Sequence, residues 1–154
     1  MYVPHTIEKQ ERINDPLLTR FKYYQYDTHG NILEQSKAND VLNTYIWGYN
    51  NTFPVAEVTG ASYNDVIVLL NQNVLQNPFS DQVLRDELQK IRQNFPYAVV
   101  TSFTYKPLVG ITSVTDVRNS TTYYEYDNFG RLQRIKDRDN NIVRAFDYKY
   151  QEQQ

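Results

Sequence analysis

The chain contains two histidines and no cysteine, so the side chains that most often bind metals or act as nucleophiles are scarce. His5 lies in a polar lead-in and His29 in a turn. A metal site needs several ligands that converge, and the sequence pairs neither histidine with a second ligand. Catalysis by a serine or threonine hydroxyl needs an adjacent base, and no recognisable motif supplies one. We therefore expect solvated histidines and no metal site.

One acidic segment resembles the first half of a calcium-binding loop. Asp137, Asp139 and Asn141 alternate as the first ligands of such a loop do. The loop then requires a glycine at its sixth position and an acidic residue at its twelfth, where this chain has Ile142 and Tyr148. Asp and Asn side chains also close turns by accepting bonds from nearby backbone N–H groups. We interpret the segment as an Asx-rich turn.

Carboxylates could also serve as a pair in glycoside hydrolysis. Glu34, Glu57 and Glu125 are available, but each lies in a strand or turn context that accounts for it. The five glycines are scattered, so no loop is suited to cradling phosphate. We expect that the protein is not an enzyme and that it needs no cofactor.

Aromatic residues are the most unusual part of the composition, with 14 Tyr, 7 Phe and 1 Trp. Two groups of them alternate along the chain, so that the rings of each group share one face of a strand: Tyr45, Trp47 and Tyr49, and Phe146, Tyr148 and Tyr150. These rings either pack within the sheet or against a neighbouring element, or they form a platform for a sugar or peptide. The platform interpretation requires that the rings be exposed to solvent.

The segment Tyr123–Asp137 reads as a β-hairpin and organises the rest of the chain. Its turn combines Asp127, which can bond nearby amides, with Gly130, which adopts a positive φ at low cost. The same pattern recurs about 100 residues earlier, at Tyr23–Gln35. The matching positions are Tyr23, Tyr24, Tyr26, Asp27 and Gly30 in the early copy and Tyr123, Tyr124, Tyr126, Asp127 and Gly130 in the late copy.

A weaker copy of the hairpin lies at Thr101–Asp116. Its aromatic, glycine and acidic positions precede those of the late copy by 20 or 21 residues: Tyr105 before Tyr126, Gly110 before Gly130 and Asp116 before Asp137. A period near 21 residues corresponds to one hairpin per repeat. Such a unit cannot bury its own face and needs neighbours, as in other repeat architectures.

The run Tyr126-Asp127-x-x-Gly130-Arg131-Leu132, followed by a charged turn, resembles the YD repeat of Rhs-type proteins. Tyr105–Asp116 resembles the preceding repeat of these families, and Tyr45–Val58 is similar to a segment of the large YD-repeat proteins of Bacteroidetes. The early copy departs from the motif, with Asn31-Ile32 in place of Arg131-Leu132, which marks it as a diverged repeat.

The resemblance implies β-strands wound into strips or hollow shells, on secreted or surface-exposed proteins. In several Rhs proteins the shell encloses a toxin. This chain is far too short to build a shell, and it contains no recognisable toxin segment.

Between the early and late copies, the hydrophobic period becomes helical. A first helix is predicted from the N-cap signal at Ser62 to the stop at Asn77-Pro78. A second is predicted from Ser80 to Pro96, with an apolar face formed by Leu84, Leu88, Ile91 and Phe95. The residues expected on its outer side are Arg85, Asp86, Gln89, Lys90 and Arg92. We predict a helical hairpin that packs on one face of the sheet.

Charge and hydropathy narrow the possible partners. The net charge of -2 gives no electrostatic signature for nucleic acid or an anionic membrane. No apolar run is long enough for a transmembrane helix, and the N-terminal residues lack the pattern of a signal peptide. If the family is secreted, we expect this chain to be a piece of a larger one or to lack its own signal.

The sequence thus predicts an α+β fold in which antiparallel hairpins form a twisted sheet strip, with an inserted helical hairpin on one face. We expect a single composite domain over residues 1–154. It comprises a diverged repeat at 1–58 that opens with a loose lead-in over 1–19, the helical insertion at 62–95 and further repeats at 99–150.

An open strip exposes edge strands, which invite pairing with another chain. We therefore predict a non-catalytic structural or interaction module of a larger YD-repeat protein at the cell surface or outside the cell. Its expected partner is the rest of that protein or a second copy. The alternative is a carbohydrate- or peptide-binding module that uses the Tyr/Trp face. A toxin or enzyme fragment, the third option, would need a cleft with converging polar groups, which the sequence does not indicate.

Overall fold

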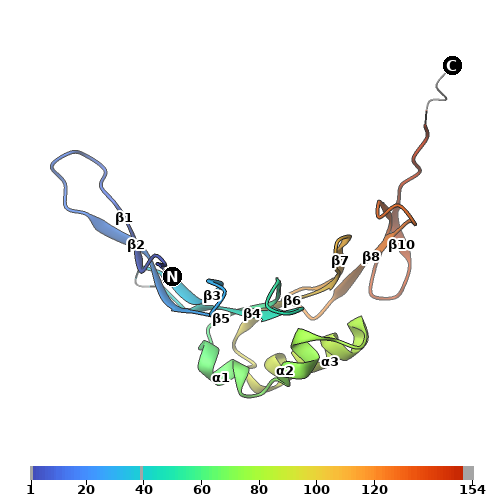
Figure 1. Ribbon diagram of the computed structural model, residues 1–154, viewed down its shortest axis with the longest axis horizontal. Coiled ribbons are helices and arrows are strands. Elements are labelled where there is room, and N and C mark those ends of the chain that lie inside the picture. Colours follow the sequence, from blue (N-terminus) through green and yellow to red (C-terminus); the bar gives the residue numbers. More distant parts are fainter. Residues whose placement is uncertain (1, 39, 151–154) are drawn as a thin grey trace.

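The computed structural model describes residues 2–38 and 40–150, which form one antiparallel sheet and three helices. Its ten strands lie side by side in chain order, so each strand pairs with its neighbours in the sequence (Figure 1). The strands are β1 (Thr6–Lys9), β2 (Leu18–Tyr26), β3 (Ile32–Lys37), β4 (Asn43–Gly48), β5 (Phe53–Thr59), β6 (Val99–Lys106), β7 (Gly110–Thr115), β8 (Thr121–Tyr126), β9 (Leu132–Lys136) and β10 (Ile142–Ala145). The broad class predicted from the sequence, antiparallel sheet with added helices, is confirmed.

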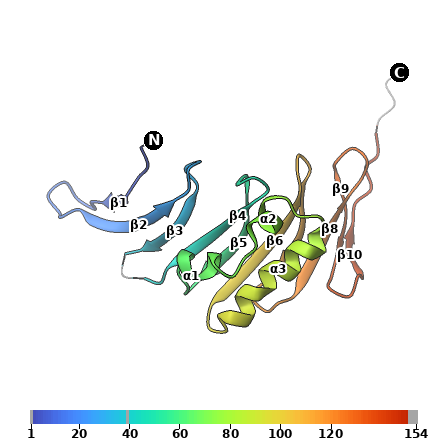
Figure 2. The same cartoon turned by 60° about the horizontal axis from the view of Figure 1, so that its bottom comes forward.

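The helices are inserted between β5 and β6 and cover only the middle of the sheet. They are α1 (Tyr63–Ile67), α2 (Gln72–Gln76) and α3 (Asp81–Asn94). Figure 1 shows the strip rising at both ends, with the helices beneath its middle strands. In Figure 2, α3 lies over the middle strands, beside β6. The convex face is therefore covered in the middle, while no helix of the described chain lies on the concave face.

The N-terminal stretch, predicted as a loose lead-in, contains a strand. β1 pairs with β2, with Ile7 opposite Phe21. The backbone N–H of Tyr23 donates to the carbonyl of His5 at 2.9 Å. The prediction was wrong because charged and polar neighbours masked a short β-forming run at Thr6-Ile7. His5 itself is exposed and lies just before this strand.

β-bulges recur beside the turns of four hairpins along the sheet. In four hairpins the pairing register shifts at an aromatic residue: between Gln25 and Tyr26, Ile46 and Trp47, Thr104 and Tyr105, and Glu125 and Tyr126. A bulge bends a strand and increases its right-handed twist. Repetition of the same bulge in successive hairpins accounts physically for the curvature of the strip.

The hydrophobic core lies between the helices and strands β4 to β6. Leu84, Leu88 and Ile91 of α3 are fully buried there, as the helical spacing predicted. Gly48 allows α2 to approach the sheet closely, because a Cβ at this position would lie 2.6 Å from the carbonyl oxygen of Leu75. The core therefore depends on one apolar helix face and on one position without a side chain.

The first predicted helix is divided in two. Ser62 caps α1 and Ser80 caps α3, at the positions the sequence indicated. The interruption occurs at residues 68–71, where the side chain of Asn71 accepts the N–H of Asn73 and caps α2. The backbone N–H of Asn71 donates to the buried carboxylate of Glu87 at 2.8 Å. These bonds favour the start of a second helix over continuation of the first.

None of the helices described is long and apolar enough to cross a membrane.

We expect Leu88→Ala to lower the free energy of unfolding by about 2–5 kcal/mol, because the substitution leaves a cavity in the packed core. Urea denaturation followed by circular dichroism measures this change. Gln93→Ala, on the exposed side of the same helix, is the matched control and should have an effect below about 0.5 kcal/mol. Similar losses for the two variants would contradict the assignment of the core.

Candidate interaction surface

Five aromatic side chains join neighbouring strands by the same hydrogen bond, and we call them the aromatic ladder. In each, a Tyr hydroxyl or the Trp Nε1–H donates to a backbone carbonyl on or next to the preceding strand. The pairs are Tyr26 to Pro4, Trp47 to Ile32, Tyr105 to Pro54, Tyr126 to Ile111 and Tyr148 to Leu132, at 2.5 to 2.9 Å. The polar tips that could have contacted a ligand are therefore used within the sheet.

The ladder follows the repeat period seen in the sequence. Trp47 follows Tyr26 by 21 residues, and Tyr126 follows Tyr105 by the same interval. The longer interval between Trp47 and Tyr105 contains the three helices. Burial raises the pKa of Tyr105 to about 12 and also raises the pKa of Tyr26 and Tyr126. These hydroxyls keep their protons at neutral pH, as a hydrogen-bond donor must.

Four aspartates close turns in the same way. In each turn, one carboxylate oxygen accepts the backbone N–H groups two and four residues later. The residue three positions after the aspartate, the fourth of the turn, has a positive φ. The aspartates are Asp27, Asp116, Asp127 and Asp137, and the fourth residues are Gly30, Asn119, Gly130 and Asn140. Glycine and asparagine suit this position because they tolerate the left-handed region. Asp137 thus closes an Asx turn, as the sequence predicted.

Gly110 and Gly130, aligned in the sequence, have different roles. Gly130 (φ 74°) takes the left-handed position of the Asp127 turn. Gly110 begins β7, and a Cβ there would lie 2.6 Å from the hydroxyl of Tyr126. The left-handed residue of the turn between β6 and β7 is Leu108 (φ 65°). Gly110 is therefore needed for space beneath a ladder ring.

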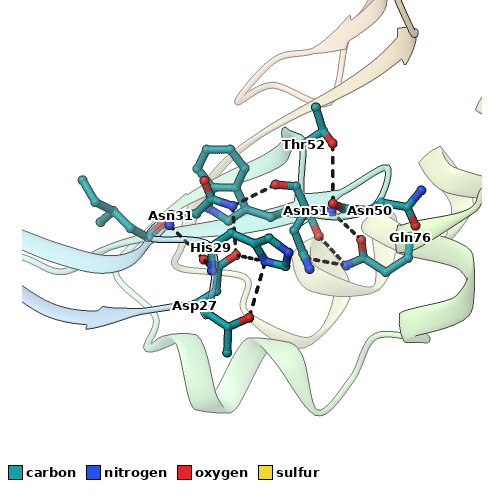
Figure 3. Close-up of polar contacts among 10 residues, drawn as sticks. Asp27, His29, Asn31, Asn50, Asn51, Thr52 and Gln76 are labelled. Atoms are coloured by element: carbon teal, nitrogen blue, oxygen red, sulfur yellow. Dashed lines mark hydrogen bonds and ion pairs between the residues drawn. The ribbon is translucent and has the colours of Figure 1, made fainter. Parts of the chain in front are cut away.

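A network of amide side chains connects the first hairpin turn to the turn between β4 and β5 and to α2 (Figure 3). Asn31 Nδ2 donates to the Asp27 carboxylate at 2.9 Å and to the Asn51 carbonyl at 2.8 Å. Gln76 Nε2 donates to Asn51 Oδ1 and to the Trp47 carbonyl, while Gln76 Oε1 accepts the Asn51 N–H. The network therefore fastens the backbone of these turns to one another and to α2.

His29 lies at the outer side of this network. Its ring Nδ1 is 3.7 Å from a carboxylate oxygen of Asp27, and the side chain is 58% exposed. In the part of the chain that the structure describes, no three His, Cys, Asp or Glu side chains form a cluster that could hold a metal ion.

The two predicted aromatic groups do not form one surface. Tyr45 and Trp47 lie on β4, in the middle of the sheet, and both are half-buried. The Tyr45 hydroxyl accepts a bond from Gln35 at 2.8 Å. Tyr49 lies beyond β4 at a positive φ and packs edge-on against Phe53 and Tyr105.

The second group lies on the C-terminal segment, past β10. The N–H of Phe146 donates to the carbonyl of Gln133. The rings of Tyr148 and Tyr150 lie 4.5 and 5.1 Å from the guanidinium of Arg131. Arg131 also forms an ion pair with Asp127. These rings hold the C-terminal segment against the last hairpin.

A mostly apolar hollow remains beside Trp47. It has a volume of about 400 Å³, and its lining residues are Gly30, Ile32, Gln35, Tyr45, Trp47 and Pro54. It could hold an apolar side chain or the face of a sugar ring, because an aromatic wall with few polar groups suits both.

The two edges of the sheet are the largest unpaired features of the described chain. β1 and β10 each have one neighbouring strand, and all their residues are exposed. The N–H of Phe146 points toward β9, so by the alternation of antiparallel pairing the N–H of Ala145 points outward. β10 therefore presents free donors and acceptors along its outer side.

Two arginines on α3 contradict the predicted outward placement. Arg85 donates to Ser113 Oγ at 3.1 Å, and Arg92 donates to Ser102 Oγ at 3.3 Å. Both therefore contact the sheet. They are seven residues apart, as are Leu84 and Ile91, so the spacing itself was a signal that they share a face. No residue pattern within the helix itself shows that polar strands lie beneath that face.

Comparison with known proteins identifies no family. No protein-family model matches the chain, and no curated protein matches it. One similar solved structure is described as TcdB2-TccC3 without its hypervariable C-terminal region, with 10% sequence identity and a TM-score of 0.49. The match covers 91% of this chain and 7% of that chain, so this chain spans a small part of its length. A similarity of this size assigns neither family nor function.

We expect Tyr126→Phe to lower the free energy of unfolding by about 0.5–1.5 kcal/mol, because the Ile111 carbonyl loses its hydrogen-bond donor. Chemical denaturation measures the loss. Tyr97→Phe makes the same change on a ring that is 98% exposed and should be nearly neutral. If the two variants were equally stable, the ladder bond would not contribute to the free energy of unfolding.

The turn at Asp127 should make stability depend on pH. The hydrogen bond from the Arg131 side chain lowers the pKa of Asp127 below its ordinary value. The stabilisation is therefore complete above the unfolded-state pKa of about 3.9 and is lost as pH falls through the folded-state pKa. We expect the melting temperature of the wild type to fall more steeply between pH 5 and pH 2 than that of Asp127→Asn. Parallel curves would show that the Asp127 charge does not contribute.

Proposed function

We propose that this chain is a non-catalytic structural and interaction module that joins further β-structure through the edges of its sheet. The observation that supports this proposal best is the open ten-stranded strip with exposed β1 and β10 edges. An unpaired edge presents backbone groups that another strand can satisfy. Antiparallel addition to β10 would continue the alternation present throughout the sheet.

Repetition within the strip supports the same role. The ladder bond and the Asp turn recur in successive hairpins. Each hairpin therefore makes the same kind of contact with the hairpin before it and with the hairpin after it. Modules that contact only their neighbours can be extended without a new core. We propose that the chain functions as part of a longer array of such hairpins.

The Tyr-Asp-x-x-Gly-Arg-Leu run at residues 126–132 supports assignment of the chain to the YD-repeat class. In that context, the larger protein would be secreted or exposed at the cell surface, and the partner would be its remaining repeats or a second copy. We propose no catalytic role, because the polar networks around the turns anchor backbone.

The second candidate function is recognition of a peptide or sugar at the hollow beside Trp47. The apolar lining supports it, and the indole lies at the site, so binding would change the fluorescence of the single tryptophan. No change across a broad panel of glycans and peptides would argue against this function. The bonds already made by Trp47 and Tyr45 make it the weaker candidate.

We expect the purified protein to form dimers or larger assemblies as its concentration rises, because free β10 groups pair between chains. Light scattering coupled to size exclusion measures the mass. Ala145→Pro removes the outward N–H and should raise the concentration needed for association at least about tenfold, since proline cannot donate to a ladder.

The matched control for this experiment is Ala145→Thr, which keeps the backbone donor and has good strand propensity. It should associate as the wild type does. A wild type that remains monomeric at high concentration would contradict edge pairing, and equal association of the proline and threonine variants would exclude β10 as the edge involved.

A further inference from the structure

The sheet surface beneath α3 changes character along the strip. On β4, β5 and the start of β6, the buried side chains that face the helices are mostly apolar, as at Ile46, Val58 and Val100, with Thr44 as a polar exception. Farther along β6 and on β7 the buried positions carry hydroxyls: Ser102, Thr104, Ser113 and Thr115. Leu84 and Leu88 of α3 thus pack on the apolar strands, while Arg85 and Arg92 extend over the polar ones. A hollow remains between the helix and these polar strands.

The two arginines at this hollow have no carboxylate partner among the ion pairs of the described chain. Both are half-buried. Arg131, also half-buried, is instead paired with Asp127. A partly desolvated guanidinium without a counter-charge is costly to keep. The carboxylate of Asp116 acts on the charge of Arg92, so Arg85 is the arginine whose positive charge suits an anionic ligand.

Arg92 is largely occupied by the fold. Its guanidinium donates to Ser102 Oγ and to the backbone carbonyls of Val100, Thr115 and Asp116, at 2.9 to 3.3 Å. It therefore fastens α3 to β6 and to the turn after β7. We treat it as a support of the site and not as the group that meets a ligand.

Arg85 is held in place but is not saturated. It donates one bond to Ser113 Oγ at 3.1 Å and one to Gln82 Oε1 at 3.0 Å, and its guanidinium lies 5.2 Å from the ring centre of Tyr123. A guanidinium has five N–H donors, so three remain. The contacts with Ser113, Gln82 and Tyr123 orient the group in advance of binding.

The hollow has a volume of about 270 Å³, several times the roughly 30 Å³ that a water molecule takes up in the liquid. Its lining is mainly polar, and besides the two arginines it includes the carboxylate of Asp86, the amides of Gln82, Gln89 and Asn119, and the phenol of Tyr123. Asp86 accepts a bond from Gln82 at 2.7 Å, so Gln82 links it to Arg85. A ligand here would meet a cation and a carboxylate within the same site.

We propose that this hollow binds a carboxylated sugar. The ligand's carboxylate would pair with Arg85, whose planar N–H groups match two carboxylate oxygens. Its hydroxyl groups would donate to Asp86 and exchange bonds with Gln89 and Asn119. A simple anion would leave Asp86 facing negative charge, and a neutral sugar would leave Arg85 without a partner. A sugar acid satisfies both groups, and this site is independent of the sheet-edge function proposed above.

The test is titration of the protein with galacturonate, followed by amide chemical shifts in two-dimensional NMR, with galactose as the neutral match. We expect saturable shifts around α3, β7 and β8 with galacturonate and at least about tenfold weaker binding of galactose. Arg85→Gln should weaken galacturonate binding at least tenfold. Arg144→Gln removes an exposed arginine on β10 and should leave binding unchanged.

Asn119→Gly provides a variant that keeps the fold, because glycine suits the positive φ of 60° at this turn position. It should weaken binding severalfold without changing the dispersion of the spectrum. Tighter binding of a galacturonate trimer than of the monomer would identify a glycan chain as the ligand that carries the sugar acid. Equal binding would identify the free sugar acid as the ligand. No shifts at 10 mM galacturonate, equal binding of galactose, or unchanged binding by Arg85→Gln would overturn the proposal.

Discussion

The hydrogen bond from an aromatic side chain to a carbonyl on the preceding strand is the interaction on which the open strip depends. Isolated hairpins are marginal in water, and the helices cover only the middle strands. Toward the ends, the strands have no covering layer in the described structure, so cross-strand bonds and ring contacts must hold them together. Tyr26 and Tyr126 do this at opposite ends of the sheet. A bulge lies beside each of these rings, so the residue that stabilises the pairing also marks the point where the strip bends.

The parts of the fold that could be predicted are those in which neighbouring residues carry the signal. Tyr126 ends a strand with a ladder bond, and Asp127 begins the next turn by accepting backbone amides. The two repeated features, the ladder bond and the Asp turn, thus depend on two adjacent residues, so both can be recognised from one short motif. Helix caps are similarly local, which explains why Ser62 and Ser80 could be recognised.

The parts that could not be predicted depend on contacts between segments far apart in the chain. Asn71 interrupts a helical pattern because Glu87 reaches its backbone from another helix. Arg85 and Arg92 appeared to be solvent-facing because nothing on α3 itself reveals the hydroxyl-rich strands beneath it. The aromatic groups posed the same problem: alternation shows that the rings share a face of a strand. It does not show that the indole N–H of Trp47 donates to the Ile32 carbonyl, or that the ring of Tyr148 packs against the guanidinium of Arg131.

Because every strand pairs only with its sequence neighbours, the topology has a kinetic consequence. Each pairing closes a short loop except that of β5 with β6, which must wait for the helical insertion. Loop closure costs more entropy as the loop lengthens, and this single nonlocal step also buries the apolar core seen in the described residues. Once it forms, the outer hairpins can add one after another at low entropic cost. Amide protection should therefore be greatest in β4 to β6 and decline toward both ends, as in a zipper that closes from its centre.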